Sequence, residues 1–279
     1  MSDLRLDATQ LDRYSRHVIM DEIGPAGQAR LLDASVLVVG AGGLGSPVIQ
    51  YLAAAGVGRL GIVDDDVVER SNLHRQVVHG DGDVGRPKVE SAADFVRRLN
   101  PDVDVDPIET RLTATTVDEI VATGDYDIVC DASDTFPTRY LLNDYCVLAE
   151  LPLVHGAIYR FEGQATTVEN DGEGPCYRCT FPEAPPPGTV PDCATTGVLG
   201  VLPGTIGCIQ ATEACKLLLD RGDLLTGRLL LYDAMAMTVE TVDLERNPAC
   251  PVCGDDPTIE SVQDVTYDGT CAPTGATTE

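Results

Sequence analysis

The chain has 279 residues, 43% of them hydrophobic, and a formal net charge of -26 at pH 7. This length suits one large domain or two tightly joined ones, and the charge argues against nucleic-acid and anionic-membrane partners. The N-terminus is charged without an apolar core, and no apolar run could span a bilayer, so we expect a cytoplasmic protein. The scattered acids fit either an acidic binding face or a hydrated surface suited to high salt.

The first half of the sequence alternates short apolar runs with helical stretches, after a segment at 9–31 that predicts one or two surface helices. Apolar runs of this kind are typical of buried parallel strands, so the pattern predicts a doubly wound, Rossmann-like sheet up to about residue 158. The expected strands are 36–39, 60–63, 103–109, 126–130 and 153–159, and the expected helices are 46–55, 87–101, 115–123 and 139–150.

The second half of the sequence has a different pattern. Residues 161–169 alternate in polarity like an antiparallel strand, and 228–234 and 238–245 predict two closing strands. An apolar helix is expected at 197–220, after a proline-rich loop at 181–193 that is too long for a simple connection. The predicted fold class is therefore α/β, with a Rossmann-like sheet extended by antiparallel strands.

A glycine-rich loop follows the first buried strand. Gly40, Gly42, Gly43 and Gly45 lie between this strand and a helix, where glycine lets the backbone approach a phosphate at the helix N-terminus. Asp64 ends the next strand, where a carboxylate can accept hydrogen bonds from ribose hydroxyls. These features predict a nucleotide site without deciding between ATP and NAD; the alternative is a glycine turn needed only for packing.

Polar and cationic residues accumulate just downstream of Asp64. The chain has only two lysines, and Lys88 is placed near the start of an expected helix, after Asn72, Arg75 and Gln76. Nucleotidyl transfer needs cations around the α-phosphate as pyrophosphate leaves, whereas a dehydrogenase needs only the ribose acid here. The set favours ATP, and the alternative is that Arg75 and Lys88 are ordinary surface cations.

Several ordered segments resemble the MoeB/ThiF family, the ubiquitin-activating-enzyme-like adenylyltransferases. The resemblance covers roughly residues 10–254 and implies ATP-dependent adenylation of the C-terminal carboxylate of a small ubiquitin-like or sulfur-carrier protein ending in Gly-Gly. It also implies a homodimer. The segments that carry it are RYSRHVIM at 13–20, GAGGLGSP at 40–47, DDDVVERSNLHRQ at 64–76, GRPK at 85–88 and DASDTFPTRYLLND at 131–144.

The resemblance also assigns roles to individual residues. Asp134 would bind Mg²⁺, and Arg16 would reach the triphosphate in the neighbouring subunit. With no separate general base in the family, catalysis would be positioning and charge neutralisation. The residues implied to hold ATP are those of the glycine loop together with Asp64, Ser71, Asn72, Arg75, Lys88, Asp134 and Thr135.

Asp134 also has support from its position in the sequence. It follows an expected strand, and ligands of open α/β sheets bind beyond the carboxyl ends of the strands. A hard carboxylate donor there suits Mg²⁺ that bridges ATP phosphates. The alternative is that Asp134 caps the N-terminus of the following helix.

Two C-x-x-C pairs, Cys176 with Cys179 and Cys250 with Cys253, could supply four thiolates to a tetrahedral structural Zn²⁺ site. The alternatives are two redox pairs or four buried thiols. Cys193 has no such partner and is part of the proline-rich loop, so it is a candidate nucleophile. In the family a cysteine in this loop can form a thioester or acyl-disulfide with the activated protein, although not every member uses it.

These motifs divide the chain into an N-terminal helical segment (1–34), a Rossmann-like ATP-binding part (35–158), a carrier-binding, crossover-loop and zinc part of the same domain (159–254), and a disordered tail (255–279). The competing functions are an NAD-dependent oxidoreductase and a non-catalytic nucleotide-binding scaffold. The carrier could serve molybdopterin synthesis, tRNA thiolation, thiamine synthesis or protein conjugation. No rhodanese-like domain follows Cys253, so we expect any sulfur donor to be a separate protein.

Overall fold

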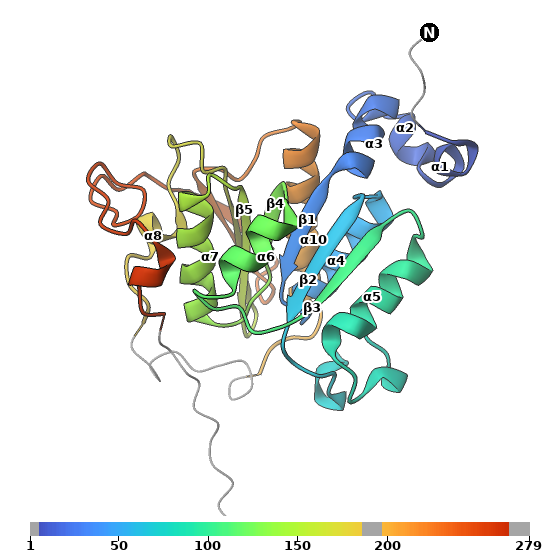
Figure 1. The fold of residues 1–279 in the computed structure, drawn as a ribbon, viewed down its shortest axis with the longest axis horizontal. Coiled ribbons are helices and arrows are strands. Elements are labelled where there is room, and N and C mark those ends of the chain that lie inside the picture. Colours follow the sequence, from blue (N-terminus) through green and yellow to red (C-terminus); the bar gives the residue numbers. More distant parts are fainter. Residues whose placement is uncertain (1–5, 186–196, 268–279) are drawn as a thin grey trace, which may run out of the picture.

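The computed structural model describes residues 6–185 and 197–267 (Figure 1). Its elements are α1 (Ala8–Arg13), α2 (Ser15–Val18), α3 (Gly24–Asp33), β1 (Ser35–Val39), α4 (Gly45–Ala55), β2 (Arg59–Asp64), η1 (Arg70–Asn72), η2 (Asp81–Asp83), α5 (Lys88–Leu99), β3 (Asp104–Glu109), α6 (Val117–Gly124), β4 (Ile128–Asp131), α7 (Phe136–Leu148), β5 (Leu153–Tyr159), β6 (Glu162–Val168), α8 (Tyr177–Thr180), α10 (Leu202–Leu219), β7 (Arg228–Asp233), β8 (Thr238–Asp243) and η3 (Val262–Asp264).

The strands form a mixed sheet of eight, in the order β3-β2-β1-β4-β5-β6-β7-β8. The five strands from β3 to β5 pair in parallel, and β6, β7 and β8 continue the sheet with antiparallel pairing. The predicted fold class is therefore confirmed. The order reverses where β1 neighbours both β2 and β4, and such switch points are where open α/β sheets bind ligands.

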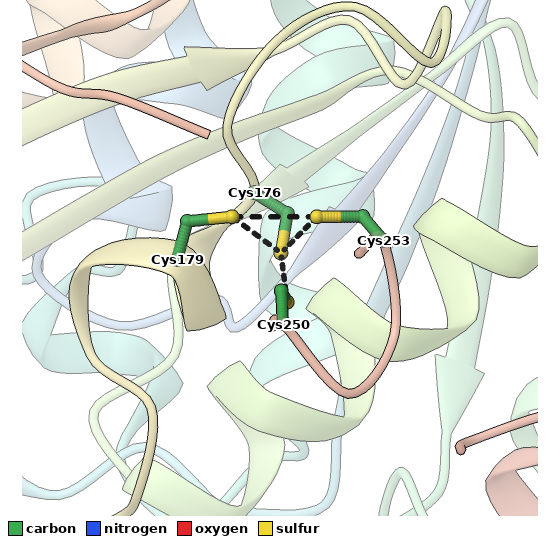
Figure 2. Close-up of side chains that lie close together, drawn as sticks. All are labelled: Cys176, Cys179, Cys250 and Cys253. Atoms are coloured by element: carbon green, nitrogen blue, oxygen red, sulfur yellow. Dashed lines mark hydrogen bonds between the residues drawn. The ribbon is translucent and has the colours of Figure 1, made fainter. Parts of the chain in front are cut away.

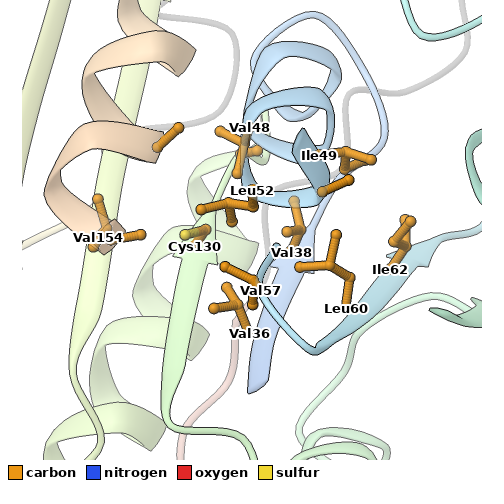
Figure 3. Packing of buried hydrophobic residues seen from close by; sticks show 14 of the residues in the cluster. Val36, Val38, Val48, Ile49, Leu52, Val57, Leu60, Ile62, Cys130 and Val154 are labelled. Carbon is orange, nitrogen blue, oxygen red and sulfur yellow. The ribbon is translucent and has the colours of Figure 1, made fainter. Parts of the chain in front are cut away.

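Two apolar layers cover the parallel part of the sheet because successive side chains of a strand point to opposite faces. Val36 and Val38 of β1 are fully buried and belong to one layer, with α4, α10 and part of α5 (Figure 3). Leu37 and Val39 belong to the other layer, with α6 and α7. Strands buried on both faces explain why the sequence shows continuous apolar runs here.

The N-terminal helices are anchored to the main body by Tyr14, which is 3% exposed. Its ring packs so closely on Gly56 that a Cβ there would lie 2.5 Å from the ring. Asn100 donates a hydrogen bond to the Tyr14 hydroxyl at 2.8 Å. Arg16 on α2 is exposed two residues beyond this anchor.

Residues 255–267 differ from the expected disordered tail. Val262 is 3% exposed and packs in the layer of α6 and α7, and the Tyr267 hydroxyl donates to Asp144 Oδ2 at 2.8 Å. The polar composition of this segment gave no indication that Val262 and Tyr267 would anchor it to the domain. The remainder of the expected tail lies outside the described residues, as does the loop position Cys193.

Within the described part of the chain, no helix combines the length and the apolar character needed to cross a membrane.

Candidate nucleotide site and cysteine cluster

A cavity of about 290 Å³ opens at the carboxyl ends of β1, β2 and β4. It is placed at the switch point of the sheet, between the glycine-rich loop and the N-terminus of α7. The predicted site residues that line it are Gly40, Gly42, Gly43, Asp64, Arg75, Lys88, Asp134 and Thr135.

The glycine-rich loop turns tightly enough to require glycine at two positions. Gly40 has φ +100, and a Cβ there would lie 2.7 Å from the Ala132 carbonyl oxygen. Gly45 begins α4, and a Cβ there would lie 1.8 Å from the Gly40 carbonyl oxygen. The loop thereby brings backbone N–H groups and the positive end of the α4 dipole to the cavity, as phosphate binding requires.

We predict that Gly45→Ala weakens ATP binding by at least about tenfold, because the added methyl must push the loop away from the helix. Isothermal titration calorimetry with ATP measures the loss. Gly82→Ala is the matched control, since a Cβ at Gly82 meets nothing within 4 Å. Equal affinities for the Gly45 variant and the wild type would show that the loop does not hold the nucleotide.

Asp64 is tied to the glycine loop by its own carboxylate, whose Oδ2 accepts the Ala41 N–H at 2.8 Å. Burial raises the pKa of Asp64 above its usual value, although Lys88 and the backbone donors act against this. The carboxylate therefore sits at the end of β2 with its orientation fixed. It is placed where a ribose hydroxyl would be bound.

Lys88, the first residue of α5, is a buried cation in the lining of the cavity, with a side chain only 6% exposed. Its Nζ lies 2.7 Å from Asp66 Oδ2 and 3.7 Å from Asp64 Oδ1. Burial acts to lower the pKa of Lys88, but the two carboxylates outweigh it and the pKa is raised. Because Asp66 is 68% exposed, its carboxylate can turn to solvent and leave the ammonium to an incoming phosphate.

Arg75 also lines the cavity, and its guanidinium donates hydrogen bonds to the Ser71 carbonyl and to Asn72. Arg75 Nη2 donates to Asn72 Oδ1 at 3.0 Å, so Asn72 orients the guanidinium. Ser71 is exposed and donates to Glu69 at 3.2 Å. Both were predicted to hold nucleotide; in this structure neither is among the residues lining the cavity.

Asp134 is exposed at the cavity, immediately before α7. The N-cap of α7 is Thr135, whose hydroxyl accepts the Thr138 N–H at 3.4 Å, so the alternative that Asp134 caps this helix is wrong. Its carboxylate is left to face the cavity. A hard oxygen donor in that place fits Mg²⁺ bound together with phosphate oxygens.

Two arginines that line the cavity were not predicted as site residues from the sequence. Arg139 is 9% exposed, and its guanidinium packs 5.2 Å from the Phe136 ring. It is four residues after Thr135, so helical spacing places it on the same side of α7, a signal the sequence offered. Arg111 follows β3, and the strand-end rule that singled out Asp64 and Asp134 applies equally to it.

The four cysteines of the C-x-x-C pairs come together although 74 residues separate Cys176 from Cys250 (Figure 2). The sulfur of Cys176 lies 3.9 Å from that of Cys179, 3.6 Å from that of Cys250 and 3.4 Å from that of Cys253. Disulfide sulfurs would be about 2.05 Å apart, whereas thiolates around tetrahedral Zn²⁺ would be about 3.8 Å apart. The four sulfurs gather in one group at a spacing that fits a closed four-sulfur metal site.

The remaining described cysteines belong to the interior or to α10. Cys130 and Cys146 are fully buried, and burial raises the pKa of both thiols, as expected for core residues. Cys208 and Cys215 are partly buried on α10. None of these four belongs to the metal-spaced group.

Comparison with known proteins gives the family. The ThiF family matches residues 14–252. The SAMP-activating enzyme E1 of Haloferax volcanii is 70% identical over 269 residues, which cover 96% of this chain and 98% of that protein. The chain belongs to the ThiF family.

Other relatives of this ThiF-family chain have similar descriptions. The sulfur carrier protein adenylyltransferase of Thermus thermophilus is 53% identical, over 96% of this chain and 99% of its own length. The adenylyltransferase and sulfurtransferase MOCS3 of Sus scrofa is 52% identical over 95% of this chain, which spans only 58% of that longer protein. Among solved structures, E. coli MccB has a TM-score of 0.76 at 23% identity, covering 87% of this chain and 74% of MccB, which supports the fold.

Proposed function

We propose that this protein is an ATP-dependent adenylyltransferase that activates the C-terminal carboxylate of a small ubiquitin-like or sulfur-carrier protein. The observation that carries the proposal is Lys88, a buried ammonium in the same cavity as the glycine loop, Asp64 and Asp134. Its full-length relatives are named for activating SAMP and for adenylylating a sulfur carrier protein. An NAD-dependent oxidoreductase would not require the cations Lys88 and Arg75 at this position.

The chemistry needs little beyond placement and charge. The carrier carboxylate is already a nucleophile; one oxygen attacks the α-phosphorus, the bond to pyrophosphate breaks, and an acyl-adenylate forms. Asp64 would orient the ribose, while Lys88 and Arg75 would offset the negative charge that develops on the phosphates. Asp134 would hold Mg²⁺, which when bound neutralises phosphate oxygens. The cationic set argues against a scaffold that binds nucleotide without acting on it.

The proposal is tested by pyrophosphate exchange. Protein, ATP, Mg²⁺ and labelled pyrophosphate are mixed with and without a carrier ending in Gly-Gly. Label should enter ATP only when the carrier is present, because reversal requires the acyl-adenylate. Exchange of equal size without the carrier would contradict the proposal. Reduction of NAD by the protein, when NAD is supplied in place of ATP, would also contradict it.

The proposal extends to the chemistry of the carrier and to the use of its activated carboxylate. We expect a small partner with a C-terminal Gly-Gly, as the family resemblance implies. The activated carboxylate would serve sulfur transfer for molybdopterin synthesis or tRNA thiolation, protein conjugation, or several of these, in the cytoplasm. Sulfur would come from a separate donor protein. Zn²⁺ would occupy the four-cysteine cluster in a structural role, because four protein thiolates leave it no open position.

We also propose a homodimer in which Arg16 completes the neighbour's cavity. In this chain Arg16 is exposed on α2 and does not line its own cavity. Mixing Arg16→Ala with Lys88→Ala should then restore up to about a quarter of wild-type exchange, because a mixed two-fold dimer has one cavity with both residues. If subunits exchange freely and no activity returns, Arg16 does not act in the neighbour.

Cys193 is proposed to act only after adenylation. Its thiolate would attack the acyl carbon, forming a thioester while AMP leaves with the bonding electrons. No thiol takes part in the earlier step, so Cys193→Ser should keep carrier-dependent exchange and metal content yet fail to form a thioester or deliver sulfur. Pyrophosphate exchange measures adenylation, whereas non-reducing gels and AMP release measure thioester formation. Loss of exchange in this variant would show that the two steps are not separate.

A further inference from the structure

A buried carboxylate–histidine pair lies between the nucleotide cavity and the cysteine cluster. Asp131 ends β4 and is paired in register with His155 of the neighbouring strand β5. His155 Nδ1 lies 2.7 Å from Asp131 Oδ2, and both side chains are 1% exposed. Neither residue lines the cavity, so neither can touch the nucleotide directly.

Asp131 controls the backbone that leads to Asp134. Its Oδ1 accepts the N–H of Ser133 at 3.0 Å and the Ser133 hydroxyl at 2.6 Å. Its main-chain carbonyl accepts Gln210 Nε2 at 2.7 Å. Ser133 lines the cavity and directly precedes Asp134. The Asp131 carboxylate therefore fixes the backbone position from which the Asp134 side chain extends.

His155 supplies the other half of this arrangement. Burial acts to raise the pKa of Asp131, but the hydrogen bond from His155, with the nearby charge of Arg139, outweighs it and the pKa is lowered. Asp131 therefore stays an acceptor for Ser133. The imidazole is held by the Tyr177 ring, 4.8 Å away between centroids, and Tyr177 belongs to the turn between Cys176 and Cys179.

The second ring nitrogen of His155, Nε2, indicates which of the hydrogen bonds of this side chain is important. His155 Nε2 is buried and has no hydrogen-bond partner among the described residues. Leaving a buried polar atom unpaired has a cost, so a histidine kept here only for packing would be a poor choice. The contact that offsets this cost is the one from Nδ1 to Asp131.

We propose that His155 is a positioning residue for adenylation, which orients Asp131 and thereby sets the Ser133–Asp134 backbone that presents the Mg²⁺-binding carboxylate. The inference rests on the proposed function. A donor at the Nδ1 position is what this role requires. Asparagine can place its side-chain N–H there, whereas the amide of glutamine reaches further and leucine offers no donor.

The test compares His155→Asn, His155→Gln and His155→Leu. For the leucine and glutamine variants, the Mg²⁺ concentration that gives half-maximal pyrophosphate exchange should rise at least about tenfold, with a smaller change in rate at saturating Mg²⁺. His155→Asn should restore the wild-type value. If leucine at this position prevents folding, the comparison of asparagine with glutamine decides.

A second readout needs no activity. Hydrogen exchange of the Ser133 amide should be at least about tenfold faster in the glutamine variant than in the wild type or the asparagine variant, because its acceptor is no longer held. This measurement decides whether His155 holds the Ser133 backbone through Asp131 even if the wild type shows no carrier-dependent exchange, a result that would defeat the proposed function.

The matched control is Thr167→Val, which removes a buried hydrogen bond on β6, from the Thr167 hydroxyl to Glu213 Oε2 at 2.9 Å, away from the cavity. It should lower the melting temperature without changing the Mg²⁺ dependence. Unchanged Mg²⁺ dependence and Ser133 exchange in His155→Gln would overturn the inference. An effect of Thr167→Val as large as that of the glutamine variant would do the same.

Discussion

Replacing Lys88 by alanine should reduce carrier-dependent pyrophosphate exchange by about a hundredfold to a thousandfold, the size expected for losing a preorganised charge at a transition state. The ammonium is almost completely buried in the cavity, and the only other lysine, Lys216, is bonded to Glu213 on α10. Without Lys88, the pKa of Asp64 rises further, because burial already raises it and Lys88 opposes that rise. The change therefore weakens phosphate and ribose binding together.

The control for Lys88→Ala is Arg70→Ala. It removes an exposed cation from the same part of the chain, paired on the surface with Asp81, and exchange should stay within about twofold of wild type. Melting temperatures of both variants show whether the fold is intact. Near-normal exchange by a folded Lys88→Ala protein would remove the basis for an ATP site in this cavity.

Substituting one cysteine of the four-sulfur cluster should have the largest effect on stability. We expect Cys253→Ser to lose the metal ion and at least about 3 kcal/mol of the free energy of unfolding, since metal binding at a structural site is folding free energy. The cluster joins the turn at Cys176 to a C-terminal segment that adds Val252 and Val262 to the core. Metal content by mass spectrometry and chemical denaturation measure the two losses.

Cys208→Ser is the matched control for this variant, because Cys208 is a partly buried cysteine of α10 outside the cluster. It should retain one metal ion per chain and change the stability by less than about 1 kcal/mol. A wild-type protein that contains no metal, or a Cys253→Ser protein as stable as Cys208→Ser, would show that the cluster is only a group of buried thiols.

The parts of the fold that were predictable are those with local physical signals. Apolar runs with a glycine loop predicted the parallel strands, and the carboxyl-end rule led from the sequence to Asp64 and Asp134. The two C-x-x-C pairs were joined by ligand chemistry alone. Each of these signals is contained in short motifs that can be recognised without knowing the tertiary structure.

Features that depend on lateral contacts could not be predicted. The pairing of Asp131 with His155 follows from the register of β4 on β5, which no local pattern specifies. The hydrogen bond from Arg75 to Asn72 depends on the geometry of η1, which no local pattern specifies. The anchoring of residues 255–267 rests on Val262 and Tyr267, single contacts within an otherwise polar segment.

The central claim is that a carrier carboxylate attacks the α-phosphorus of ATP. Its most direct test uses a carrier whose C-terminal carboxylate contains heavy oxygen. One labelled oxygen would bridge the acyl group and the phosphorus, so AMP released when hydroxylamine attacks the acyl carbon should carry a single heavy oxygen. Unlabelled AMP, or ADP and phosphate in place of AMP and pyrophosphate, would contradict adenylation of the carrier.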